Sequence, residues 1–579
     1  MQVVDFLRSV PVLAGLSNVL LERLAGEVAN VQVEAGQWIM REGEAADSMF
    51  IVRSGRLEVV DEGPPERKIR ILRRGDALGE LALLREGKRS ASVRARRDAR
   101  LFELGRAQFE ALIQDAPSFA LGLTRAMGAQ LAASRTPMLA ATTPQTIAVV
   151  GLEPAAPTAG VAHQLAEAFS LHGTTALLSD GELATIDQAE RDVERVVMSA
   201  AVLGDAWGDL CVAEADLIVV LSTGDRRARW HDRAASLEGC ELLVFGPAPA
   251  PGVLEALRPR EVQVIAQEAR RRSALEATAR RLAGCSVGVV FSGGGARAFA
   301  HLGVLEELTA AGVSFDRVAG VSFGSLVGAA TAAGFTPEGT YETCQRCFVD
   351  ANPANDFALP VYSLIRGAKT RRRLQEVFGE RRIEELPRRF FSLSCDLLAR
   401  ETVLHNSGLV VDAVYPSLLL PGVFPPVATP NGRLLVDGGV LDNLPVAAMA
   451  RTGEGPVIAI DVTGRKRRSH GERPRPPRRP RLEPLARPFR RALTGSEIEI
   501  PHLSETIART VAVGSSDTVA SARLHADLVI TPQVEGIALM DWKALPRAAQ
   551  LGREAARRAL AANPDFPGSL RGSEIAGKQ

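Results

Sequence analysis

The chain has 579 residues, of which 46% are hydrophobic and 24% charged, and its formal net charge is +1. This length predicts about three or four domains, and the balanced charge argues against a protein that binds nucleic acid over its whole surface. Six cysteines are too few for a disulfide framework, and no uncharged apolar run is long enough to span a membrane. The N-terminus also lacks the apolar core of a signal peptide, so we expect a cytoplasmic protein.

Residues 1–135 alternate short β-like runs with glycine turns, and helical stretches flank them. This spacing predicts a small β-roll. Within the block, the residues from Gly79 can open a short helix whose free N–H groups face an anion. Arg89 returns from the next strand with a fixed fork of donors for a phosphate, Ser90 adds a hydroxyl, and Glu80 could accept from a ribose hydroxyl.

This segment resembles the phosphate cassette of cyclic nucleotide-binding domains. The resemblance implies a cyclic nucleotide effector. The alternative is a β-roll kept as an interaction module with an empty pocket. The matching positions are Gly79, Glu80, Leu81, Ala82, Leu83, Arg89, Ser90, Ala91, Ser92 and Val93.

Residues 145–270 alternate short buried-looking strands with helical segments, which predicts an α/β connector domain with a parallel sheet. Its first turn, GLEPAAPTAGVA, has neither a P-loop nor a dinucleotide-binding glycine pattern, so we expect no catalytic role for it.

The block 285–450 begins with an apolar strand that ends at Gly293, Gly294 and Gly295 and continues into a helical pattern. Such glycines let the backbone bend and present N–H groups to an oxygen atom. The later segment Gly320–Gly324 reads G-x-S-x-G, with a serine at its tip. An oxyanion loop followed by a nucleophile elbow is a coherent pair for acyl chemistry.

A serine nucleophile needs a base, usually a histidine held by a carboxylate. The chain has only eight histidines, and none stands in an obvious partner motif. Downstream, Asp437 follows an apolar strand and precedes two glycines. The three motifs together resemble the patatin-like phospholipase family, whose members use a Ser-Asp dyad without histidine. The positions that match are Gly293, Gly294, Gly295 and Arg297 for the oxyanion loop, Gly320, Ser322 and Gly324 for the elbow, and Asp437 for the base.

The resemblance implies that Asp437 takes the proton of Ser322 directly. Aspartate, with a pKa of about 3.9, is a weaker base than histidine, at about 6.5. Burial is expected to raise the aspartate pKa, and a helix N-terminus at Ser322 lowers the cost of alkoxide character. If a conventional triad exists instead, His405 is the candidate base. Cys344 and Cys347 lack a second metal half-site, so we expect helix packing there and no metal.

The order of β-roll, α/β connector and three-layer α/β/α patatin-like domain, completed by residues 492–579, resembles the short bacterial form of the neuropathy target esterase family. It implies a serine esterase acting on acyl esters of phospholipids or lysophospholipids, with no cofactor required for catalysis. Two alternatives stay open. The same acyl-serine could pass to a lipid or alcohol, or the chain could be a non-catalytic nucleotide-sensing scaffold.

Residues 465–491 hold twelve basic side chains against two acidic ones and many prolines. Proline and like-charge repulsion predict an insertion without a regular helix. Our hypothesis is a tether to anionic lipid head groups, which would place the protein peripherally on the inner membrane face. The alternative is a solvated loop with no partner. Nucleic acid is not expected, because Phe489 alone is available for stacking.

Overall fold

A computed structural model of the chain divides into two compact units, which we describe separately. The first comprises residues 1–140 with 183–192, and the second comprises residues 141–182 with 193–579. The predicted insertion at 465–491 lies outside the described residues. The structure describes residues 3–13, 16–34, 36–61, 67–72, 75–84, 87–96, 99–116, 119, 144–201, 203–225, 237–247, 249, 252–352, 355–359, 363–463 and 516–564.

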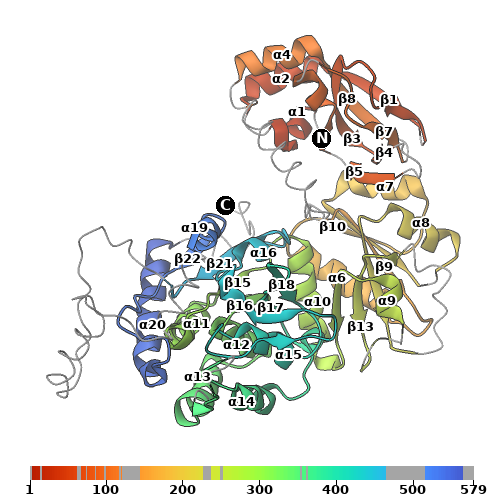
Figure 1. The fold of residues 1–579 in the computed structure, drawn as a ribbon. Coiled ribbons are helices and arrows are strands. Elements are labelled where there is room, and N and C mark those ends of the chain that lie inside the picture. Colours follow the sequence, from red (N-terminus) through yellow and green to blue (C-terminus); the bar gives the residue numbers. More distant parts are fainter. Residues whose placement is uncertain are drawn as a thin grey trace, which may run out of the picture. The chain divides into compact units, whose positions relative to one another are not determined.

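The first unit is the predicted β-roll, built from two four-stranded sheets with helices beside them (Figure 1). One sheet has the order β1 (Ala29–Val33), β8 (Ala99–Gly105), β3 (Ser48–Ser54) and β6 (Ala77–Leu78). The other has the order β2 (Trp38–Met40), β7 (Ser92–Ala95), β4 (Leu57–Asp61) and β5 (Arg67–Leu72). The helices are α1 (Val3–Ser9), η1 (Pro11–Leu13), α2 (Asn18–Glu27), α3 (Glu80–Leu84) and α4 (Arg106–Asp115).

Helix α7 (Leu183–Asp192) belongs to this first unit, although the residues on either side of it in the sequence belong to the second unit. Arg56 on the roll donates to Glu190 on α7 across 3.1 Å, and both residues are buried. A sequence boundary between residues 135 and 145 does not reveal this helix, because the contact joins positions far apart in the chain.

The second unit begins with a six-stranded sheet whose pairs are all parallel, as the βαβ pattern predicts. Every residue of the central β9 is buried, since helices cover the sheet. The strand order is β10 (Thr175–Leu178), β11 (Arg195–Ala200), β9 (Thr146–Gly151), β12 (Leu217–Ser222), β13 (Glu241–Val244) and β14 (Glu261–Val264). The helices are α6 (Thr158–Ser170), α8 (Ala206–Glu214), α9 (Val253–Leu257) and α10 (Glu268–Leu282).

The last sheet of the same unit has eight strands and is mostly parallel (Figure 1). Its main order is β19 (Val427–Ala428), β20 (Leu434–Asp437), β17 (Arg389–Asp396), β16 (Arg317–Val321), β15 (Gly288–Phe291), β21 (Val457–Ile460) and β22 (Leu528–Ile530), and β18 (Glu401–His405) pairs with β17. The helices are η3 (Gly295–Phe299), α11 (Ala300–Ala310), α12 (Phe323–Ala332), α13 (Pro337–Cys344), η4 (Gln345–Asp350), α14 (Ala368–Phe378), η6 (Ile383–Glu385), α15 (Val410–Ser417), η7 (Gly438–Val440), α16 (Val446–Ala450), α19 (Ser516–Leu524), η8 (Trp542–Ala544) and α20 (Leu545–Ala562).

Two separate hydrophobic clusters flank this sheet. Helices α11, α12, α15 and α20 share one cluster with Val289 and Phe291 of β15, whereas α16 and α19 share the other with Val290. Because alternate residues of one strand enter opposite clusters, the sheet is the middle of three layers. The predicted three-layer α/β/α domain is thus the observed one.

Ion pairs join the six-stranded sheet of the connector to the eight-stranded sheet that follows it. Arg281 of α10 contacts Glu241 of β13 and also Glu454, which precedes β21, at 2.7 Å. Arg389, the first residue of β17, bridges Glu454 and Glu261 of β14. Both sheets belong to the same compact unit. Removing one partner from this network would leave an uncompensated buried charge.

Strand β17 pairs with both strands that carry the predicted catalytic residues. Its Leu393 pairs with Val321, the last residue of β16, in parallel register. The next residue, Ser394, pairs with Asp437, the last residue of β20, in antiparallel register. Consecutive residues of β17 thus pair with the last residues of β16 and β20. This register brings Ser322, which follows β16, close to Asp437, although 114 residues separate them in the sequence.

Candidate active site

Ser322 occupies a strained turn between β16 and α12. Its φ is 52° and its ψ is −132°, a conformation that a residue with a side chain rarely adopts. The turn is tight, since a Cβ on Gly320 would lie 2.3 Å from the carbonyl oxygen of Gly324. A Cβ on Gly324 would lie 2.5 Å from the carbonyl oxygen of Phe291. Both elbow glycines are therefore required by backbone contact, in agreement with the G-x-S-x-G pattern.

Asp437 lies beside this serine at the end of β20. The Gly439 N–H donates to its carboxylate across 2.8 Å, and the Ser322 side chain is close enough to favour the charged form of the same carboxylate. Asp437 is only 3% exposed. Burial raises its pKa from 3.8 to about 6, while the Ser322 side chain and the Gly439 N–H act in the opposite direction. The carboxylate is thus a stronger base than a solvated aspartate and still ionises near neutral pH.

The three glycines after β15 form a loop against the elbow. A Cβ on Gly293 would lie 2.8 Å from the Ser322 Cβ, so the loop backbone passes directly beside the nucleophile. In the part of the chain that the structure describes, the N–H groups of Gly294 and Gly295 have no intramolecular acceptor. Such groups can donate to an oxyanion that forms at the serine.

Arg297 does not extend toward the serine as a free cation. Its Nε donates to the carbonyl oxygen of Ile537 across 2.8 Å, and the Ala296 N–H donates to that of Leu539 across 2.8 Å. The predicted arginine of the oxyanion motif therefore fastens the loop to the segment after β22.

Asn443 and His301 were not predicted as site residues, and both hold the glycine loop. The Asn443 amide donates to the Gly293 carbonyl oxygen across 3.3 Å. The His301 Nε2 donates to the Ser292 carbonyl oxygen across 2.9 Å. Burial lowers the pKa of His301 to about 4, so the ring is neutral at physiological pH. The sequence signals for these roles were the position of Asn443 shortly after the D-G-G motif and that of His301 on the helix that follows the glycine loop.

Ser417 is a further residue that sequence reasoning missed. The Ser322 N–H donates to its Oγ across 2.9 Å, at the C-terminal end of α15. This bond holds the elbow to the helix, and its 95-residue separation in the chain left no local pattern to detect.

The histidine named as an alternative base lies elsewhere. The His405 Nε2 contacts the Oγ of Ser394 at 2.7 Å, and burial lowers the pKa of this histidine to about 4. Within the described residues, no hydrogen bond joins it to Ser322 or Asp437. The geometry brings Asp437, and not His405, to the serine.

The predicted nucleotide cassette lies in the first unit. Arg89 is 6% exposed, and its guanidinium donates to the carbonyl oxygens of Ser48, across 2.7 Å, and Gly79, across 3.2 Å. Burial lowers its pKa, while the nearby Asp47 acts in the opposite direction. Gly79 has a φ of 86° and lies so close to Arg89 that a Cβ would collide with the guanidinium. Glu80 is buried at the start of α3, and Ser90 is exposed.

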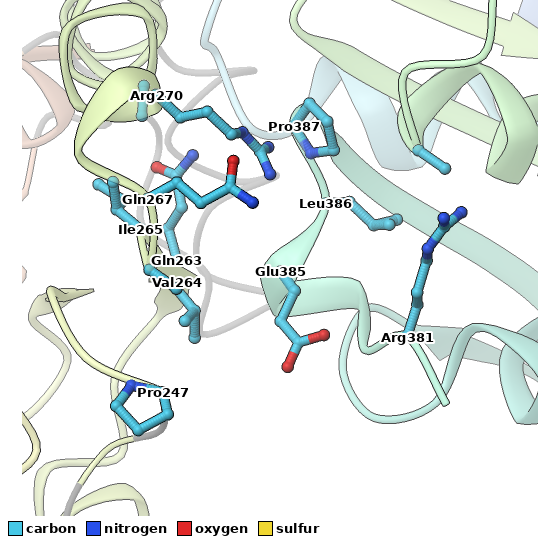
Figure 2. Close-up of a pocket in the computed structure, with 13 residues that line it drawn as sticks. Pro247, Gln263, Val264, Ile265, Gln267, Arg270, Arg381, Glu385, Leu386 and Pro387 are labelled. Atoms are coloured by element: carbon cyan, nitrogen blue, oxygen red, sulfur yellow. The ribbon is translucent and has the colours of Figure 1, made fainter. Parts of the chain in front are cut away.

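A separate cavity lies between the connector and the catalytic sheet (Figure 2). Gln263, Gln267 and Arg270 line one side, and Arg381 and Glu385 line the other. Ser322 and Asp437 are not among its lining residues, so it is distinct from the serine site. In the described ranges, no cluster of His, Cys, Asp or Glu is arranged to hold a metal ion, and no helix has the length and apolarity of a membrane span.

Comparison with known proteins identifies the class of the catalytic unit. Residues 289–450 match the patatin-like phospholipases, and residues 30–116 match the cyclic nucleotide-binding domain. An uncharacterized NTE family protein of Mycobacterium tuberculosis is 35% identical to this chain, and the match covers 97% of each chain. The chain therefore belongs to the NTE family, and it is an enzyme of the phospholipase and esterase class.

More distant relatives are larger proteins. Patatin-like phospholipase domain-containing protein 6 of Mus musculus is 26% identical, over 74% of this chain and 38% of that protein. A lysophospholipase of Coccidioides immitis is 27% identical, over 75% of this chain and 34% of that protein. This chain thus spans roughly a third of the length of these two relatives.

Proposed function

We propose that the protein hydrolyses acyl ester bonds of lysophospholipids or phospholipids with Ser322 as nucleophile and Asp437 as general base. One observation carries the proposal: a serine in a strained elbow lies beside a buried carboxylate whose pKa is raised to about 6. The fungal relative, which is a lysophospholipase by name, supports the lipid substrate.

In the proposed reaction, the Oγ of Ser322 attacks the ester carbonyl carbon while Asp437 accepts its proton. The N–H groups of Gly294 and Gly295 stabilise the oxyanion, an effect worth about 3–4 kcal/mol per donor in comparable hydrolases. Asp437 then returns the proton to the departing alcohol, and a water molecule releases the fatty acid by the reverse sequence. The N-terminus of α12 at Ser322 adds favourable potential for the negative charge.

The test is a fluorophosphonate label with mass-spectrometric mapping, together with product analysis on a panel of lysophospholipids and phospholipids. We expect the label on Ser322 and free fatty acid as the product. Labelling of Ser322 without lipid turnover would support a reactive serine and would contradict the proposed substrate class. Acylated alcohol or lipid in place of free acid would favour the acyl-transfer alternative.

We also propose that a cyclic nucleotide binds over Gly79–Ala82 with its phosphate near Arg89. The match to the nucleotide-binding domain supports this proposal, as does the inward position of Arg89. Calorimetry with cyclic AMP and cyclic GMP should give binding that Arg89→Ala abolishes. No heat at millimolar nucleotide would leave the roll as an interaction module. An effect on hydrolysis further requires that the nucleotide bind two states differently.

The basic segment 465–491 is proposed to contact anionic lipid head groups, on the grounds of its charge alone. A protein lacking this segment should lose part of its binding to anionic vesicles and keep its binding to neutral ones. Equal sedimentation of the two proteins would leave only a solvated loop.

A further inference from the structure

The catalytic unit exposes apolar side chains on two short antiparallel arms, residues 356–359 and 363–366, which we call the apolar arms. Phe357 is 72% exposed and Leu359 is 84% exposed. They are two residues apart in an extended segment, so both side chains point to the same side. The arms are paired rather than loose, because the Ala358 N–H donates to Leu364 and the Arg366 N–H donates to Asp356, across 3.0 and 2.8 Å.

The apolar arms are hydrogen-bonded to residues 419–423, a segment that also contacts Asp437. The N–H groups of Leu364 and Ile365 donate to the carbonyl oxygens of Gly422 and Val423, across 3.2 and 2.9 Å. A few residues earlier in that segment, the Leu419 carbonyl oxygen accepts from the Asp437 N–H across 3.0 Å. One short segment therefore links the exposed apolar side chains to the base of the proposed dyad.

Basic side chains lie next to the apolar arms, on and before helix α14. Helix α14 buries Thr370, Leu374 and Phe378 at four-residue spacing, which leaves its other side to the solvent. Residues 355–376 carry five basic side chains against two acidic ones. Of the basic residues, Arg366, Lys369 and Arg372 are exposed. Arg371 and Arg373 form exposed ion pairs with Asp412 and Glu376, so their charges are partly matched within the protein.

We propose that the apolar arms and the exposed cations of α14 form an interfacial docking surface for an anionic phospholipid bilayer. This proposal rests on the proposed lipid function and adds the surface through which the enzyme reaches its substrate. The exposed cations complement anionic head groups, and Phe357 and Leu359 can enter the boundary between head groups and acyl chains. Two alternative partners fit less well. A polar ligand would gain nothing from the two projecting apolar side chains, and an uncharged protein surface would gain nothing from the exposed cations.

Vesicle sedimentation tests this surface in the full chain, with Ser322→Ala throughout so that no lipid is consumed. The double variant Phe357→Ser/Leu359→Ser should partition roughly tenfold or more weakly onto anionic vesicles. The triple variant Arg366→Gln/Lys369→Gln/Arg372→Gln should bind anionic vesicles on the order of 100-fold more weakly, and its binding to neutral vesicles should change little. Leu524→Ser is the matched control, since Leu524 is 85% exposed on α19, which packs on the face of the sheet opposite to α14.

Phe357→Trp gives a second readout that does not depend on total binding. Its fluorescence should shift to shorter wavelength on anionic vesicles and be quenched by lipids brominated on the acyl chain. An unshifted, unquenched tryptophan, or sedimentation of the double variant equal to that of the Leu524→Ser control, overturns the proposal.

Activity separates this proposal from the catalytic one. With the nucleophile intact, Phe357→Ser/Leu359→Ser should hydrolyse a short, water-soluble ester within about twofold of the wild type, and hydrolyse vesicle-bound lysophospholipid at least fivefold more slowly. If the wild type hydrolyses neither, the proposed function fails, while the sedimentation and fluorescence results still decide whether the surface binds lipid.

Discussion

Among the described residues of the second unit, two serine–carboxylate pairs can be compared, and only one of them has the features of a catalytic site. In the connector, the Ser222 Oγ donates to the Glu153 carboxylate across 2.8 Å, at the C-terminal end of β12. In the eight-stranded sheet, the Ser322 side chain lies beside the Asp437 carboxylate at the end of β20 and favours its charged form. Both carboxylates are 3% exposed. A buried serine–carboxylate contact at the end of a parallel strand therefore does not by itself define an active site.

The surroundings separate the two pairs. Glu153 also accepts from the Thr223 N–H across 2.9 Å, and Ser222 accepts from the Gly224 N–H across 3.1 Å, so the connector pair closes a local turn. This pair lies at the carboxyl ends of the neighbouring strands β9 and β12, the position at which open α/β sheets commonly bind ligands. Ser322 instead has a positive φ and lies beside a loop in which the N–H groups of Gly294 and Gly295 have no internal acceptor within the described structure. Backbone strain and available donors, rather than the pair itself, distinguish the second site.

The largest expected difference is in catalysis. Ser322→Ala should lower kcat/KM for a lysophospholipid by about 10³-fold or more, because the nucleophile is lost. Ser222→Ala should leave kcat/KM within about twofold of the wild type and reduce stability by about 1–2 kcal/mol. Steady-state kinetics and denaturant unfolding measure these effects. A comparable loss of activity in both variants would show that the comparison is wrong.

His301 gives the next largest effect. His301→Leu removes the donor to the Ser292 carbonyl oxygen and should lower kcat by about 10–100-fold with little change in KM, because oxyanion stabilisation acts in the transition state. His301→Gln can keep a donor near the Nε2 position and should recover part of the loss. A role in packing alone predicts the reverse order, with leucine tolerated better than glutamine.

A smaller effect concerns stability and its pH dependence. The pKa of Asp437 is raised from 3.8 to about 6 in the folded state, so the folded protein binds this proton more tightly than the unfolded chain does. The resulting contribution to the free energy of unfolding is complete below pH 4 and is lost as the pH rises through 6. Asp437→Asn should therefore be more stable than the wild type by on the order of 2–3 kcal/mol at pH 7–8. That gain should vanish near pH 4. Thermal unfolding across this pH range would reveal a constant difference if the site were not responsible.

Glu153→Gln provides the matched variant in the connector and the smallest effect. It replaces hydrogen bonds to a charged acceptor with weaker ones and should cost about 1 kcal/mol of stability. Hydrolysis should be unchanged within about twofold. A clear loss of kcat would mean that the connector crevice communicates with the serine site.

The three motifs of the catalytic block were visible in the sequence because each is local: glycines that a backbone approach requires, a serine between glycines, and an aspartate before glycines. The alternation of strands and helices likewise predicted the α/β class of the connector and of the domain that follows it. Composition and periodicity report such features because neighbouring residues determine them.

The supporting contacts were not predictable in the same way. Ser417, Asn443 and Glu153 act through partners far along the chain, and nothing in their own neighbourhoods identifies those partners. Strand register supplies the missing information, since β17 pairs with Val321 and Asp437 at consecutive positions. The same reason explains why His405 remained a candidate until its contact with Ser394 was known.

The most direct test of the Ser322–Asp437 account is the rate of fluorophosphonate labelling as a function of pH. In the wild type, the rate should rise as pH passes about 6, where Asp437 becomes ionised and can accept the serine proton, and should then level off. Asp437→Asn should label at least 10³-fold more slowly and lose this step, while His405→Ala should keep both the rate and the step. Rapid labelling of Asp437→Asn with the step retained, or loss of the step in His405→Ala, would contradict the account.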